Sequence, residues 1–326
     1  MRLNEVFKQY LLDCEVRGQT RETLLWYRRR LGFFVSAMEQ SDVTELEQVQ
    51  IGHLRQFVQR LMTTKANERH PNKPTQEKTL SLQTVRGYVR SIKTFFTWCV
   101  DEELLGVSPA ARLVQPKAPE YLIPTFSQKH IEIMLASCDQ TEALCFRDYV
   151  LLLVFLDTGM RLSELCGLHV TDVYERYIRV FGKGRKEREI GIHPEVGKLL
   201  WKYIHKYRKP ANPAEEGLFV GRYGEPLKLR GVEDLFKRLK RNCNLEGVRV
   251  SPHTFRHTFA KMYLEQGGEL FKLSREMGHS TVQVTEAYLK QFRSAEARRE
   301  HTDFSPIGQI DLKKTKRSNR RKKENL

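Results

Sequence analysis

The stretch VQPKAPEYLIP, residues 114–124, most constrains how this chain can fold. It carries three prolines, and each one removes a backbone donor and disfavours helix for the residue before it. Such a stretch is a poor helix and a poor central strand, so it is best placed between two folded bodies. For 326 residues we predict a first domain over 1–113, a linker over 114–125, a second domain over 126–300 and a basic tail over 301–326.

The first domain is predicted to be almost wholly helical. Apolar residues recur with helical spacing in three segments, 2–17, 20–40 and 51–64. Thr20 is placed to cap the second helix, and Ser81 caps a fourth helix that follows a polar, proline-bearing loop over 65–80. The buried face of this fourth helix is predicted to comprise Leu82, Val85, Tyr88, Val89, Ile92, Phe95, Phe96 and Cys99.

Another face of the same helix carries a basic stripe, Arg86, Arg90 and Lys93. A solvated charged surface accounts for such a stripe, and so does a helix that follows the phosphates of DNA. Both interpretations remain open.

The second domain is predicted to be helical around one small antiparallel sheet. Its segment RYIRVFGKGRKEREIGI, residues 176–192, alternates and turns at Gly182-Lys183-Gly184 as a hairpin does. Helices are expected over 127–137, 143–158, 194–208, 230–242, 252–266, 269–277 and 281–290. The fold class is therefore mainly α, with an α+β second domain.

The net charge of +16, with a pI near 9.6, favours a polyanionic partner. The last 14 residues, Lys313 to Leu326, carry eight basic side chains against one glutamate, which leaves about +9 on the rest of the chain. No apolar run approaches the 18 residues of a membrane span, so a membrane partner is not expected. The six cysteines lack metal-binding spacing and are predicted to be reduced thiols of a cytoplasmic protein.

The motifs that hold nucleotides are missing from the sequence. Neither a phosphate loop of the G-x-x-x-x-G-K-[ST] type nor a G-x-G-x-x-G following a strand occurs. We therefore expect neither nucleotide hydrolysis nor a dinucleotide cofactor.

The segment SPHTFRHTFA, residues 251–260, begins with the preferred chemistry of a helix start, a serine cap and a proline in the first turn. His253 and Arg256 are three residues apart, so they share a face at the helix end that attracts anions. A satisfied histidine pair would explain this pattern alone. A zinc site at His253 and His257 is disfavoured, because the H-E-x-x-H glutamate and an evident third ligand are missing.

Four further polar residues lie at predicted element boundaries. Arg161 follows the glycine of LDTGMRLSEL, and Glu164, three residues on, is placed to support its guanidinium. Lys183 lies at the predicted hairpin tip, His279 immediately precedes a predicted helix start, and Tyr288 lies nine residues beyond it. Each residue has an ordinary structural explanation by itself.

Together the order Arg161, Lys183, His253-x-x-Arg256, His279 and Tyr288 resembles the tyrosine recombinase (phage integrase, Xer-like) family. The motifs that carry the resemblance are TGMRLSEL, GKGRKERE, SPHTFRHTFA and MGHSTVQVTEAYL. The resemblance covers nearly the whole chain. It implies a helical core-binding domain over 1–113 and a catalytic domain over 126–300, which together form a C-shaped clamp on DNA.

The resemblance also implies a mechanism. Tyr288 would attack a phosphodiester to give a 3′-phosphotyrosine, Arg161 and Arg256 would clamp the phosphate oxygens, and Lys183 would protonate the leaving 5′-oxygen. His253 and His279 would donate to phosphate oxygens or assist proton transfer. The covalent link conserves the bond energy, so no ATP, metal or other cofactor is expected.

The implied partner is double-stranded DNA carrying paired recombination sites. The protein would be a monomer when free and a homotetramer in the synaptic complex, acting on the nucleoid in the cytoplasm. Arg86, Arg90 and Lys93 would help to bind the duplex.

The long loop over 65–80 and the basic tail favour a recombinase that integrates or excises a mobile element. An Xer-type resolvase of chromosome or plasmid dimers is the alternative. A type IB topoisomerase-like enzyme and a non-catalytic DNA-binding regulator are weaker alternatives.

Overall fold

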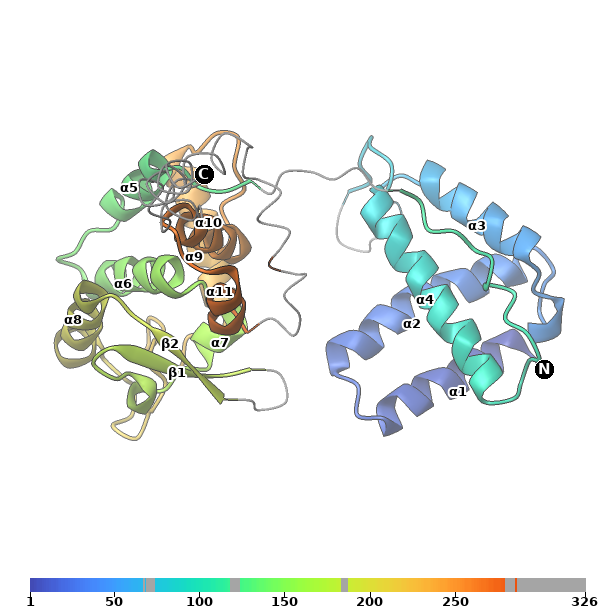
Figure 1. Cartoon of the computed structure of the whole chain (residues 1–326), viewed down its shortest axis with the longest axis horizontal. Coiled ribbons are helices and arrows are strands. Elements are labelled where there is room, and N and C mark those ends of the chain that lie inside the picture. Colours follow the sequence, from blue (N-terminus) through green and yellow to red (C-terminus); the bar gives the residue numbers. More distant parts are fainter. Residues whose placement is uncertain (67, 69–73, 118–123, 183–186, 279–284, 286–326) are drawn as a thin grey trace, which may run out of the picture. The chain divides into compact units, whose positions relative to one another are not determined.

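The computed structural model describes residues 1–66, 68, 74–117, 124–182, 187–278 and 285. The chain forms two compact units, Met1–Glu120 and Tyr121–Leu326 (Figure 1). Among the described helices, none combines the length and apolar character needed to cross a bilayer.

The first unit is helical throughout its regular structure. Its elements are α1 (Leu3–Val16), α2 (Arg21–Glu39), the 3₁₀ turn η1 (Leu46–Gln48), α3 (Ile51–Thr63) and α4 (Leu82–Asp101). The predicted caps are confirmed, because the hydroxyls of Thr20 and Ser81 accept hydrogen bonds from the amides of Thr23 and Thr84.

The α4 helix packs against α1, α2 and α3 (Figure 1). Six of the eight residues predicted for its buried face are fully buried, and only Leu82 and Tyr88 are half-exposed. Leu82 lies in the first turn, where the helix end meets solvent. Tyr88 packs at the edge of the core, with its ring 5.9 Å from that of Phe33.

The predicted loop between α3 and α4 has more order at its ends than the sequence indicated. Lys65 pairs with Thr79 in antiparallel fashion, and the amide of Leu80 donates to the carbonyl of Thr64 at 2.9 Å. These bonds hold the start of α4 close to the end of α3.

The second unit surrounds the apolar helix α6. In chain order its elements are α5 (Gln128–Ala136), α6 (Ala143–Thr158), α7 (Leu162–Cys166), the 3₁₀ turn η2 (Val170–Asp172), β1 (Tyr177–Phe181), β2 (Glu187–Gly191), α8 (Pro194–Lys202), the π-helical turn η4 (Tyr203–Tyr207), α9 (Leu229–Cys243), α10 (Pro252–Glu265) and α11 (Leu270–Glu276). The helix predicted over 194–208 is therefore α8 followed by a π turn, and residues 281–290 lie outside the described residues except for Thr285.

Contacts between elements arrange the two strands, α10 and α11 around this core. The strands β1 and β2 form an antiparallel pair in which Tyr177 faces Gly191 and Phe181 faces Glu187, and β2 contacts α11. The helix α10 packs along α6, and its Phe255 ring lies 4.8 Å from that of Phe126. The predicted fold class, mainly helical with one small antiparallel sheet, is confirmed.

Candidate active site

The end of α6 begins the site. Gly159 ends the helix in the left-handed conformation, with φ of +57°, and a side chain there would place its Cβ 2.3 Å from the ring of Phe259. Only glycine meets both conditions. Its carbonyl accepts a hydrogen bond from Arg256 Nη1 at 2.7 Å, so the same turn that starts α7 also fixes an arginine of α10.

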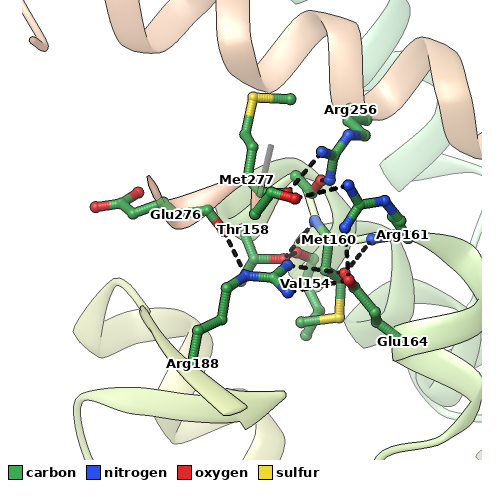
Figure 2. A network of polar contacts seen from close by, with 11 residues as sticks. Val154, Thr158, Met160, Arg161, Glu164, Arg188, Arg256, Glu276 and Met277 are labelled. Carbon is green, nitrogen blue, oxygen red and sulfur yellow. Dashed lines mark hydrogen bonds and ion pairs between the residues drawn. The ribbon is translucent and has the colours of Figure 1, made fainter. Parts of the chain in front are cut away.

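Glu164 of α7 is the centre of the polar network in Figure 2. Its carboxylate accepts from the Arg161 amide and Nη1, both at 2.8 Å, which confirms the predicted support of Arg161. It also accepts a bidentate pair of bonds from Arg188 of β2, at 3.0 and 2.9 Å. The side chain is only 4% exposed, yet these donors outweigh its burial, which alone would raise its pKa, and hold the pKa of Glu164 below its usual value.

Three successive carbonyls at the end of α11 each accept a hydrogen bond from a different arginine. Glu276 accepts from Arg188 Nε at 2.8 Å, and Met277 accepts from Arg256 Nη2 at 2.7 Å. The next carbonyl, that of Gly278, accepts from Arg161 Nη2 at 2.9 Å. The last carbonyls of a helix lack partners within it and carry its partial negative charge, so three cations there are favourable.

Two of these guanidiniums, those of Arg161 and Arg188, pair with the Glu164 carboxylate, and the third, that of Arg256, is bound to the carbonyls of Gly159 and Met277. The group of three cations and one anion therefore keeps an excess positive charge. The arginines differ in access: Arg256 is buried at 6% exposure, whereas the Arg161 side chain is 39% exposed. Arg161 and Arg256 are bound to adjacent carbonyls of the same turn, so both belong to one site. Such a pair of planar donors suits the oxygens of a phosphate.

The predicted start of α10 is confirmed. Ser251 accepts from the amide of Thr254, Pro252 occupies the first turn, and His253 is exposed there, three residues before Arg256. Burial, together with the nearby His253 and Arg256, lowers the pKa of His257. His257 therefore favours the neutral form and differs from His253 in access to solvent.

The described residues contain no group of three or more His, Cys, Asp or Glu side chains that could hold a metal ion. The zinc alternative for His253 and His257 thus finds no third ligand within that part of the chain. Lys183, His279 and Tyr288 lie outside the described residues.

The basic stripe on α4 divides in the structure. Arg90 is exposed and Arg86 is half-buried, but Lys93 donates from Nζ to the carbonyls of Leu113 at 3.0 Å and Ala111 at 3.4 Å. Lys93 therefore holds the segment after α4. Its role in DNA binding remains a prediction, as do those of Arg86 and Arg90.

Two arginines with defined contacts in the structure have only a weak signal in the sequence. Arg188 joins β2 to Glu164 and α11, and only its period-two spacing from the buried Ile190 gives a sign that it faces inward. The guanidinium carbon of Arg30, in α2, lies 4.3 Å from the ring centre of Trp26 and 5.5 Å from that of Tyr88. The i, i+4 spacing of Trp26 and Arg30 could have indicated that contact.

The family model described as "Phage integrase family" matches residues 124–294 of this chain. Among similar proteins, "Tyrosine recombinase XerC" of Corynebacterium efficiens is 33% identical over 229 residues, covering 67% of this chain and 73% of the relative. "Tyrosine recombinase XerD" of Staphylococcus epidermidis is 25% identical over 309 residues, covering 93% of this chain and 99% of the relative.

Solved structures of similar fold include two integrases. The Tn1549 transposon integrase in complex with transposon right end DNA matches with a TM-score of 0.72 and 22% identity, covering 94% of this chain and 100% of that one. A lambda integrase dimer bound to a COC′ core site matches with a TM-score of 0.67 and 15% identity, covering 87% and 97%.

Proposed function

Because this chain belongs to the phage integrase family of tyrosine recombinases, which are site-specific DNA strand transferases, we propose that Arg161 and Arg256 bind the scissile phosphate. The observation that carries the proposal is their anchoring on the adjacent carbonyls of Gly278 and Met277. Donors fixed in advance stabilise the charge of a transition state without reorganising during the reaction.

The proposed reaction conserves one phosphodiester. The Tyr288 oxygen bonds to phosphorus while the bond to the 5′-oxygen breaks, which leaves a 3′-phosphotyrosine and a free 5′-hydroxyl. Lys183 gives the leaving oxygen its proton, and His253 and His279 donate to phosphate oxygens or assist proton transfer from the tyrosine. Attack by a second 5′-hydroxyl reverses these steps, so the proposed cycle requires neither ATP nor a metal ion.

The nucleophile is tested with a DNA duplex nicked near the cleavage point, on which a covalent adduct is trapped. Wild-type protein should form an adduct that survives denaturing electrophoresis. Tyr288→Phe should bind the same duplex and form no adduct. An adduct formed by Tyr288→Phe would contradict the assignment of Tyr288.

We further propose that residues 1–113 bind core DNA and that residues 126–300 carry out catalysis, together forming a clamp on the duplex. The complexes of the transposon and lambda integrases with DNA support this proposal by analogy of fold. The partner is then double-stranded DNA with paired sites, on which four protomers assemble from free monomers. Such a protein would act on the nucleoid in the cytoplasm.

For the biological role we propose integration or excision of a mobile element, with Xer-type dimer resolution as the alternative. The sequence match to XerD over almost the whole chain favours the alternative, whereas the long loop over 65–80 and the basic tail favour a mobile element. A two-site plasmid assay tests recombination: products with exchanged flanks are expected. Relaxation of a supercoiled plasmid without such products would indicate a topoisomerase-like enzyme.

A further inference from the structure

Arg188 is held at a single place by all three of its guanidinium nitrogens. Two of them donate to the carboxylate of Glu164 and the third donates to the carbonyl of Glu276. The side chain is 16% exposed and fits beneath Gly278, where an added Cβ would come within 2.9 Å of the guanidinium carbon. Arg188 therefore faces the interior of the site and is less exposed than Arg161.

Arg188 and Arg161 share the same carboxylate unequally. Arg188 contacts both oxygens of Glu164, whereas the Arg161 side chain contacts only Oε1. Arg161 is also more than twice as exposed. Bidentate pairing by the less exposed arginine balances the charge of Glu164, so the charge of Arg161 is not consumed by that carboxylate.

We propose that Arg188 is a positioning residue for strand transfer, which neutralises Glu164 so that Arg161 can serve the scissile phosphate. This inference rests on the proposed function, because it assumes that Arg161 binds phosphate. Without Arg188, Glu164 would be balanced by Arg161 alone. The guanidinium of Arg161 would then be drawn toward the carboxylate and away from the DNA.

The test measures single-turnover adduct formation on the nicked duplex at saturating protein, together with DNA affinity and the thermal midpoint. Arg188→Gln should slow adduct formation by roughly 100-fold, as expected when a catalytic group is misplaced by about an ångström, while DNA affinity stays near that of the wild type. Arg188→Lys keeps the charge without the planar fork, so it should recover most of the rate.

The decisive comparison removes the charge of Glu164. In a Glu164→Gln background, adding Arg188→Gln should change the rate by no more than about threefold, because no carboxylate charge remains to be neutralised. This double variant also avoids a buried carboxylate that has lost its bidentate partner, a loss that could unfold Arg188→Gln. The comparison with Glu164→Gln alone therefore works even where the single variant does not fold.

Arg179→Gln is the matched control, because Arg179 lies on β1 of the same hairpin and pairs with Asp172 of η2 instead of Glu164. It should cleave at the wild-type rate. Equal losses from Arg188→Gln with and without the Glu164 charge would overturn the inference, as would a full rate for Arg188→Gln at saturation. A wild type that forms no adduct would overturn the proposed function itself.

Discussion

The two units hold their arginines in different ways. The comparison is between Arg86 and Arg90 of the first unit and Arg161 and Arg188 of the second. In the described part of the chain, no ion pair involves Arg86 or Arg90. Arg161 and Arg188 instead close on the buried Glu164 at 2.8 to 3.0 Å. Charges without fixed partners supply affinity for a polyanion at many positions, whereas charges fixed in place can recognise one phosphate.

The first test of this difference removes the Glu164 carboxylate, which fixes Arg161 and Arg188. Glu164→Ala leaves Arg188 buried without its carboxylate, so the free energy of unfolding should fall by about 3 to 5 kcal/mol. Denaturation by urea, followed by circular dichroism, measures this loss. A fall in the free energy of unfolding of less than about 1 kcal/mol would mean that the Glu164 network stabilises the protein no more than ordinary surface ion pairs do.

Arg161 is the more exposed of the two arginines that pair with Glu164, and its removal should slow DNA cleavage. Arg161→Ala should slow adduct formation at saturating protein by about 100- to 1000-fold, because one oxyanion donor is lost. Its DNA affinity should change far less. A loss that vanishes at saturation, and that added salt reproduces in the wild type, would make Arg161 an electrostatic contact like those proposed for the first unit.

The fixed carboxylate also predicts a dependence on pH. The pKa of Glu164 is lowered in the folded protein, so its stabilisation is complete above the unfolded value of about 4.5 and is lost as pH falls through the lower folded value. The stability advantage of wild type over Glu164→Gln should therefore shrink as pH falls below about 4.5. Urea titrations of both proteins at several pH values measure the difference in their free energies of unfolding. A constant difference would mean that Glu164 does not titrate differently in the two states.

The sequence predicts contacts between residues that are close along the chain. The spacing of three residues predicted the support of Arg161 by Glu164, and local chemistry predicted the caps at Thr20, Ser81 and Ser251. Helical and strand periodicity likewise predicted the fold class, because each element needs an apolar face.

Partners that tertiary packing brings together cannot be predicted from local sequence patterns. Arg188 bonds Glu164 and Glu276, which are 24 and 88 residues away, and no local rule joins such positions. Lys93 also has partners that its spacing did not indicate. Its spacing placed it in a basic stripe, but its ammonium bonds Leu113, 20 residues further on in a segment without periodicity.

The smallest expected effect separates Arg90 from Lys93 within that stripe. Arg90→Ala should lower the slope of log affinity against log salt by about 1, because one phosphate contact is lost, and should leave cleavage at saturation unchanged. Lys93→Ala should lower the slope by less, because its ammonium already donates to the carbonyls of Ala111 and Leu113. Fluorescence anisotropy of labelled duplex across a salt series measures both slopes. Equal slopes for the two variants would show that helical spacing alone, and not the contacts of Lys93, decides which side chains reach DNA.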